Sequence, residues 1–357
     1  MHTSKPHLWL RAETRANEAR YPLSPRGAAQ MMAQGWHVTV EHSDQRCIPL
    51  SAYDGAALAP LGGWREAPAD AVILGLKELP KDTGPLCHRH IMFGHAYKDQ
   101  PDAPDLLRRF QDGGGSLLDL EYLTDPSGRR QVAFGHWAGF AGALVSVQAW
   151  AAQHSGTPCP HQTQRVDADA MITETARLMD ALPHALPRPR VIVIGALGRV
   201  GRGAAAACAA LDLPVTGWDM AETAHGGPFP AIQDHDIFLN CILAAPDTPV
   251  FVPPTMRDAP DRHLRVVGDI ACDPGSPYSP VPLYDDATTW AAPVVRVAHT
   301  PALDIMAIDN LPAMLPADSS AEFSEGLLPL LMDLEHDTSG VWARAMEHFN
   351  TACATRP

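Results

Sequence analysis

Short apolar runs alternate with helical segments along most of this chain, and this alternation limits the possible folds more than any other feature. In the first part of the chain, runs of mainly apolar residues predict strands at residues 8–10, 37–41, 71–76, 91–94 and 116–120. Helices are predicted between them at residues 24–34 and 105–112. Ser24-Pro25 is typical of a helix start, and Gly35 is typical of a helix end. Strands that are separated by helices favour an α/β fold with a mostly parallel sheet.

A second series of the same kind begins near residue 190. Strands are predicted at residues 191–195, 214–218, 237–241 and 265–270, and helices at 169–182 and 202–211. A long Gly/Ala-rich helix at 137–153 connects the two series, and two amphipathic helices near 321–331 and 340–350 return to the first. We therefore expect a discontinuous substrate lobe at 1–134 with 318–357. A cofactor-binding lobe at 135–317 would include the connecting helix.

The charge balance argues against polyanionic partners. The chain has 27 Lys and Arg against 41 Asp and Glu, a formal net charge of −14, whereas phosphate recognition needs a basic face. No stretch approaches the ~18 apolar residues that a membrane-spanning helix needs. We therefore expect neither a nucleic-acid nor a membrane partner.

The cysteines and histidines point to a cytoplasmic protein without a metal. Seven dispersed cysteines with no CxxC pair are typical of reduced thiols, and no apolar segment near the N-terminus is long enough for a secretory signal. His88 and His90 are close in sequence, but no Cys/His cluster has the spacing of metal ligands.

A glycine-rich turn follows the strand predicted at 191–195. Gly195, Gly198 and Gly201 precede a predicted helix, where backbone N–H groups and the helix N-terminus favour a pyrophosphate. Their spacing is GxxGxxG and not the GxGxxG fingerprint. Asp219 ends the next strand 24 residues after Gly195, against about 20 in dinucleotide-binding folds. A carboxylate there favours NAD over NADP. A packing turn with a helix-capping Asp nearby is the alternative.

Polar residues follow three strands of the first series. Lys77-Glu78, His95 with Lys98, and Glu121 would meet at one edge, because parallel strands end on the same side. A partly desolvated lysine beside another cation can act as a base. For each residue taken alone, a solvated loop charge is the alternative.

Arginines alternate with acidic residues in the stretch 11–20. Arg11, Arg15 and Arg20 could hold carboxylates through their forked N–H groups, and the alternative is an exposed charged helix. Arg129-Arg130 follows a predicted turn at 126–128, which is also an ordinary place for surface arginines.

Eight runs of residues, spread in order over nearly the whole chain, resemble the NAD-dependent, L-lysine-forming saccharopine dehydrogenases. They are RAETRANEAR (11–20), GLKELP (75–80), GHAYKDQ (94–100), GRRQVAFG (128–135), AGFAGAL (138–144), IGALGRVG (194–201), GGPF (226–229) and IDNLP (308–312). That family is related in fold to alanine dehydrogenase and the transhydrogenase nucleotide-binding subunit. The resemblance implies an α/β protein of two Rossmann-like lobes with mostly parallel sheets and a cleft between them.

The resemblance also implies an activity and a set of site residues. The reaction would be oxidative deamination of saccharopine by NAD and water, giving lysine, 2-oxoglutarate and NADH, in a monomer or small homo-oligomer. Lys77 would be the base for the secondary amine, and His95 the acid/base for hydrolysis of the imine. Glu78 and Glu121 would tune them. The residues that would hold the substrate are Arg20, Gln100, Arg130, Phe134 and Asp273.

The residues that would line the NAD site, by the same resemblance, are Arg129, Gly195, Gly198, Arg199, Gly201, Asp219, Thr223, Leu243, Ile270, Ile308, Asp309, Asn310 and Leu311. The chain departs from some members at Val200, where those members carry a cysteine able to bridge to the match of Cys241. Two other readings remain open: another opine or amino-acid (alanine-type) dehydrogenase, and a non-catalytic NAD-binding protein.

Overall fold

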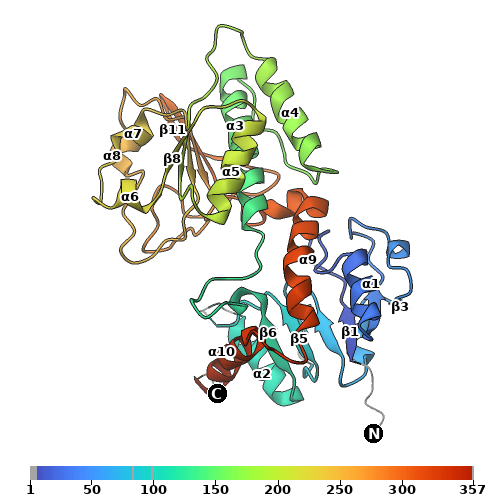
Figure 1. The fold of residues 1–357 in the computed structure, drawn as a ribbon. Helices are drawn as coiled ribbons and strands as arrows, with labels where there is room; N and C mark the ends of the chain where they lie inside the picture. Colours follow the sequence, from blue (N-terminus) through green and yellow to red (C-terminus); the bar gives the residue numbers. More distant parts are fainter. Residues whose placement is uncertain (1–5, 83, 98–99, 101, 356–357) are drawn as a thin grey trace. The chain divides into compact units, whose positions relative to one another are not determined.

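The computed structural model describes residues 6–82, 84–97, 100 and 102–355. The chain forms two compact units (Figure 1). Unit 1 comprises Met1–Ala133 and Pro316–Pro357, and unit 2 comprises Phe134–Leu315. Each unit is built around one six-stranded sheet.

The sheet of unit 1 is parallel throughout. Its strands are β1 (His7–Leu10), β2 (His37–Glu41), β3 (Ala57–Ala59), β4 (Val72–Leu74), β5 (Arg89–Met92) and β6 (Ser116–Asp119). Their order in the sheet is β3-β2-β1-β4-β5-β6, which is the order of the Rossmann fold. Leu8 of β1 pairs with Val38 of β2 on one side and with Val72 of β4 on the other. The strand order therefore reverses between β1 and β4.

The helices of unit 1 come from both ends of the chain. They are α1 (Pro25–Ala33), α2 (Ala103–Gly113), α9 (Pro316–Met332) and α10 (Val341–Thr355), with 3-10 helices at Leu50–Ala52, Gly63–Glu66 and Leu120–Tyr122. The Ser24 hydroxyl accepts a hydrogen bond from the Gly27 amide at 3.1 Å, which caps α1 as its sequence predicts. The backbone amide of Ser24 in turn donates to Ser324 of α9. The C-terminal segment thus packs on the first part of the chain.

The sheet of unit 2 is parallel except at one edge. Its strands are β7 (Val191–Ile194), β8 (Val215–Trp218), β9 (Ile237–Asn240), β10 (Val266–Asp269), β11 (Val295–His299) and β12 (Ala302–Met306), in the order β11-β12-β10-β9-β7-β8. Only the pairing of β11 with β12 is antiparallel. The two mostly parallel sheets confirm the predicted α/β class.

The helices of unit 2 include the long helix α3, against which α4 and α5 pack. They are α3 (Gly135–Ser155), α4 (Ala168–Asp180), α5 (Arg199–Ala210), α6 (Met220–Thr223), α7 (Pro230–Gln233) and α8 (Pro254–Arg257), with a 3-10 helix at Leu311–Met314. A Cβ atom on Gly139 of α3 would overlap the carbonyl of Val200, and one on Gly203 of α5 would overlap the carbonyl of His136. Glycine at both positions lets the backbones of the two helices approach closely, and Figure 1 shows α3 and α5 side by side.

The sequence-based expectations differ from the structure in several elements. Strands β3, β11 and β12 were not expected. β3 is only three residues long at a sheet edge, and β11 is exposed along most of its length, so neither has a buried apolar run to reveal it. β5 begins and ends two residues earlier than residues 91–94, and α5 begins at Arg199 and not at residue 202.

Candidate functional site

The carboxyl edge of the unit 1 sheet carries three of the predicted side chains. Lys77 lies just beyond β4, His95 lies just beyond β5, and Glu121 lies in the 3-10 helix that follows β6. Strands β4, β5 and β6 are parallel neighbours. The fold therefore brings these residues to one edge of a single sheet, where α/β proteins bind ligands.

Lys77 is a half-buried lysine among charged neighbours. Burial lowers the pKa of its ammonium group, and the positive charge of Arg20 lowers it further, while Glu18 raises it. A smaller lowering comes from Arg15. A lysine with a lowered pKa carries more of the neutral amine near neutral pH and can accept a proton there.

His95 stands beside Glu78. The Nε2 atom of His95 lies 3.8 Å from Oε1 of Glu78, and Nη1 of Arg15 lies 3.8 Å from the same oxygen. The backbone of His95 has φ of 49°, which lies in the left-handed region that non-glycine residues seldom adopt. Residues with such backbone angles are found more often at functional sites. The side chain of His95 is 42% exposed, so a solvent molecule or ligand can reach it.

Arg20 is held by a neighbouring carboxylate. Its Nε and Nη2 donate to the two oxygens of Glu18 at 2.7 and 2.5 Å, and both side chains are almost fully buried. The alternative of an exposed charged helix for the stretch 11–20 is therefore wrong: the segment is irregular, and Arg11, Glu13, Glu18 and Arg20 are buried. At the end of this segment, Ser320 of α9 accepts a hydrogen bond from the Tyr21 amide, so the segment also contacts the C-terminal part of the chain.

Arg130 and Glu121 form an ion pair at the same edge. Nη2 of Arg130 donates to Oε1 of Glu121 at 2.8 Å. Beneath them lies Asp119, fully buried, whose oxygens accept from the Gly94 and Glu121 amides at 3.1 and 2.9 Å. Burial raises the pKa of Asp119 to about 6. Asp119 thus fixes the backbone next to both His95 and Glu121. Asp119 is not among the site residues predicted from the sequence, although a carboxylate inside the apolar run SLLDL is a signal for it.

The other predicted substrate residues are more scattered. Gln100 is half-buried in unit 1, and Arg129, which was predicted for the NAD site, is exposed in a turn held by the Asp125 carboxylate. Phe134 caps α3 and Asp273 is exposed after β10, both in unit 2. Lys98 lies outside the described residues.

The glycine-rich turn of unit 2 joins β7 to α5. Gly195 has φ of 88°, and a Cβ atom there would lie 2.8 Å from the carbonyl oxygen of Cys241. A Cβ atom on Gly201 would overlap the Gly195 carbonyl, and Gly198 is the exposed cap of α5. Glycines at 195 and 201 are thus required by close packing. The exposed N-terminus of α5, with Arg199 in its first turn, fits a pyrophosphate group.

Asp219 lies directly against this turn. Its Oδ2 accepts from the Leu197 amide at 3.0 Å, and its Oδ1 accepts from the Met220 amide at 2.9 Å. Asp219 and Glu222 form a capping box on α6. Asp219 is therefore a helix cap as the alternative reading supposed, and it also places a carboxylate at the turn, where the ribose of a dinucleotide binds in this fold.

The remaining predicted cofactor residues divide by burial. Leu243 is exposed, Asp309 is exposed, and Thr223 and Asn310 are half-buried. The side chains of Ile270, Ile308 and Leu311 are buried in the apolar cluster that contains the residues of α3.

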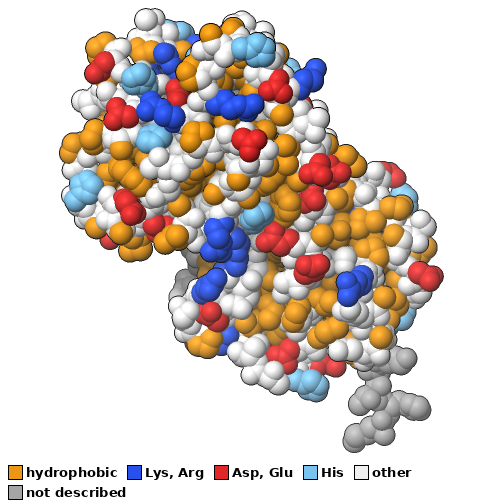
Figure 2. Space-filling view, turned by 45° about the horizontal axis from the view of Figure 1, so that its top comes forward, with side chains coloured by type: hydrophobic (Ala, Val, Ile, Leu, Met, Phe, Trp, Pro, Cys, Tyr) orange, Lys and Arg blue, Asp and Glu red, His pale blue; other side chains and the backbone are white. Residues whose placement is uncertain are grey.

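The described residues contain no cluster of three or more His, Cys, Asp or Glu side chains able to hold a metal ion. In the same residues, no helix is both long and apolar enough to cross a membrane. On the face drawn in Figure 2, acidic and basic side chains are intermixed.

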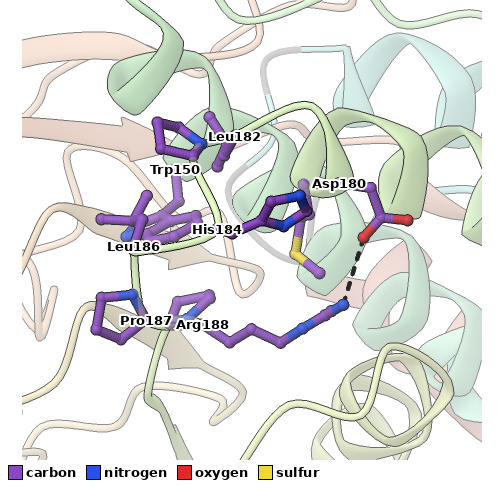
Figure 3. A pocket seen from close by; sticks show the side chains of 10 residues that line it. Trp150, Asp180, Leu182, His184, Leu186, Pro187 and Arg188 are labelled. Carbon is purple, nitrogen blue, oxygen red and sulfur yellow. Dashed lines mark hydrogen bonds and ion pairs between the residues drawn. The ribbon is translucent and has the colours of Figure 1, made fainter.

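A cavity of about 230 Å³ lies elsewhere in unit 2 (Figure 3). Trp150, His184 and Leu186 line it, and Arg188 pairs with Asp180 at its rim at 3.4 Å. None of the predicted site residues lines this cavity, and none of the residues of the glycine turn does.

The comparisons with known proteins agree with these features. Residues 9–141 match the family model for the alanine dehydrogenase/PNT N-terminal domain. The L-alanine dehydrogenase structure superposes with a TM-score of 0.66 at 14% identity, covering 97% of this chain and 94% of that chain, which shows a shared fold. A saccharopine dehydrogenase [NAD(+), L-lysine-forming] of Neurospora crassa is 44% identical over 98% of this chain and 97% of its own length. The enzyme of that name from Schizosaccharomyces pombe is 42% identical, covering 97% of this chain and 98% of its own. Such identity along nearly the whole length shows that this chain belongs to the NAD-dependent, L-lysine-forming saccharopine dehydrogenases.

Proposed function

We propose that this protein catalyses the reversible NAD-dependent oxidative deamination of saccharopine to L-lysine and 2-oxoglutarate, in lysine metabolism, with Lys77 and His95 as its acid–base groups. The observation that carries the proposal is the setting of Lys77. Its ammonium is half-buried beside Arg20 and Glu18 at the ligand-binding edge of the sheet, with a lowered pKa.

Lys77 suits the first proton transfer. Oxidation of a secondary amine requires that the amine lose its extra proton, so the base must be neutral at the working pH. Burial and the arginine lower the pKa of Lys77 towards that range. NAD supplies the chemistry of hydride acceptance when it is bound, and the protein supplies the position and the proton acceptor.

His95 suits the hydrolytic steps that follow. Water must lose a proton as it attacks the imine carbon, and the departing lysine nitrogen must gain one, so a group that both accepts and donates is needed. His95 is accessible, and its Nε2 atom lies 3.8 Å from Oε1 of Glu78. We propose that Glu78 and Glu121 tune Lys77 and His95.

Saccharopine carries three carboxylates, which suits the arginines of unit 1. Arg20 and Arg130 would each hold a substrate carboxylate, because a guanidinium has five N–H donors and can serve two acceptors. In the structure these arginines contact Glu18 and Glu121. Those carboxylates keep the guanidinium planes oriented. Gln100, Phe134 and Asp273 would complete the set.

We propose that NAD binds at the glycine turn of unit 2, with its pyrophosphate at the N-terminus of α5 and the adenosine ribose at Asp219. The tight packing at Gly195 and Gly201 and the carboxylate on the Leu197 amide support this position. Residues 135–317 would then form the NAD-binding lobe, and residues 1–134 with 318–357 the substrate lobe. The other residues would be Arg129, Gly198, Arg199, Thr223, Leu243, Ile270, Ile308, Asp309, Asn310 and Leu311.

We further propose that the enzyme works in the cytoplasm as a monomer or small homo-oligomer with small-molecule partners alone. Its seven cysteines are free thiols, which suits a reducing compartment. Light scattering coupled to gel filtration would measure the oligomeric state.

The decisive assay follows NADH absorbance with purified enzyme, lysine and 2-oxoglutarate. We expect NADH consumption that depends on both substrates, and much less with alanine plus pyruvate. Turnover only on another amine and keto acid would refute the assignment of saccharopine as the substrate and would still support the reaction class. NAD binding without turnover on any amine would refute the enzymatic function.

A further inference from the structure

Two consecutive backbone amides beyond the end of β4 are bound by one buried carboxylate. Oε1 of Glu13 accepts from the Leu76 amide at 2.7 Å, and Oε2 accepts from the Lys77 amide at 2.9 Å. Successive amides of a strand point in opposite directions. Both amides can therefore reach one carboxylate only because the chain has left the strand geometry of β4 at this point.

The carbonyl of Lys77 is bound by the partner of that carboxylate. Nη2 of Arg11 donates to the Lys77 oxygen at 2.6 Å and lies 3.3 Å from Oε2 of Glu13. The guanidinium lies against Gly75, since a Cβ atom there would be 2.5 Å from Nη2 and 2.7 Å from Nε. The backbone amide and carbonyl of Lys77 are thus both bound by side chains of one ion pair.

The ion pair is itself anchored to the sheet. The Arg11 amide donates to the Leu74 carbonyl at 2.9 Å, and Gln45 donates to the Glu13 carbonyl at 2.6 Å. Arg11 is 2% exposed and Glu13 is 6% exposed. The pair therefore links the segment that follows β1 to the segment that carries Lys77.

Burial of such a pair is costly, and buried ion pairs are poor sources of stability compared with apolar packing. The Nε group of Arg11 also has no hydrogen-bond partner among the described residues. What the pair supplies, and apolar side chains could not, is a fixed geometry for two N–H groups and one carbonyl around Lys77.

We propose that Arg11 and Glu13 are positioning residues for the reaction, holding the backbone of Lys77 so that its amine meets the substrate nitrogen. This inference rests on the role of Lys77 proposed above. Neither residue would touch the substrate. Their effect would pass through the backbone that they bind, because a displacement of about 1 Å at a reacting group can cost on the order of 100-fold in rate.

The test uses Glu13→Gln and Arg11→Lys in the full-length enzyme. A glutamine has one acceptor oxygen and binds only one of the two amides, and a lysine loses the forked contact with Glu13 and Lys77. Arg109→Lys is the matched control. Arg109 is also a buried arginine of unit 1, and it binds the Gly84 carbonyl at 2.9 Å and the Asp82 carboxylate at 2.6 Å.

We expect kcat for saccharopine oxidation to fall by about 10- to 100-fold in both test variants, with little change in the KM for NAD. The rise of rate with pH should move to higher pH, because a lysine that shifts towards water regains its ordinary pKa. Arg109→Lys should lower the thermal unfolding temperature and leave kcat and the pH profile unchanged.

Unchanged kcat and pH profile in folded Glu13→Gln and Arg11→Lys would overturn the inference. An equal fall of kcat in Arg109→Lys would overturn it too, since the effect would then be general destabilisation. If Glu13→Gln does not fold, Glu13→Asp and Arg11→Lys decide by the same criteria. The proposed function fails separately: Lys77→Met would then retain the wild-type rate and pH profile, whatever the positioning variants do.

Discussion

Asp219 offers the sharpest test of the cofactor position. Its two oxygens each accept one backbone amide, from Leu197 at 3.0 Å and from Met220 at 2.9 Å. Each carboxylate oxygen can accept a second hydrogen bond, so two ribose hydroxyls of NAD can be bound without breaking the existing contacts.

The size of the expected effect follows from these contacts. A hydrogen bond to a charged group contributes about 1.5–3 kcal/mol, so losing two of them in Asp219→Ala should weaken NAD binding by about 3 kcal/mol or more. That corresponds to a factor of at least roughly 100 in Kd. Asp219→Asn keeps one acceptor oxygen and should lose about half as much free energy. The affinity for NADP should rise relative to the affinity for NAD in both variants, because the carboxylate charge that repels a 2′-phosphate is removed.

The assay is calorimetric titration of NAD and NADP into wild-type enzyme and both variants. Asp167→Ala is the control, because Asp167 caps α4 through the Ala170 amide at 2.8 Å, away from the glycine turn. It should lose about 1 kcal/mol of stability, as the loss of a helix cap predicts, and bind NAD normally. An NAD affinity in Asp219→Ala within twofold of the wild type would refute the cofactor position.

Three further outcomes follow from the structure. Lys77→Met should reduce kcat/KM for saccharopine by about 100-fold or more and abolish the rise of rate with pH, as pH–rate profiles of both proteins would reveal. Gly201→Ala should abolish detectable NAD binding in calorimetry while preserving the circular dichroism of unit 1, because its Cβ would overlap the Gly195 carbonyl. Asp119 has a pKa raised from 3.8 to about 6, so its contribution to stability is present below pH ~4 and is lost as pH rises through 6. The loss is about 3 kcal/mol, and denaturant unfolding of Asp119→Asn from pH 4 to 7 should lack this decline; an identical decline in the variant would contradict the assignment.

Much of the fold follows from local sequence patterns. The strands at 37–41 and 191–195 and the helix at 137–153 were predicted closely, because a buried apolar run or a clear start and stop signal marks each of them. β3 and β11 carry no such mark, and only pairing with a neighbouring strand makes them strands.

The candidate site shows the same division. Lys77, His95 and Glu121 could be assigned to one edge from strand ends alone, because parallel strands impose that arrangement. Arg20 and Glu18 are alternating charges in the sequence, but only the structure shows their bidentate contact and burial, and the next residue, Tyr21, is bound by Ser320 of α9, some 300 residues later in the chain. Asp119 could have been predicted as well, because a carboxylate within the apolar run SLLDL is unusual.

By itself, the sequence determined the α/β class, the glycine turn with its carboxylate, and the family to which this chain belongs, because these depend on short patterns and on identity along the chain. Only the tertiary structure decided which charges are buried. From the sequence, Arg11 could hold a carboxylate or, with Glu13, belong to an exposed charged helix. The fold instead encloses both side chains against Gly75 and the backbone of Lys77, some 60 residues away. Burial sets both the pKa of Lys77 and its position, and burial depends on which distant segments pack together.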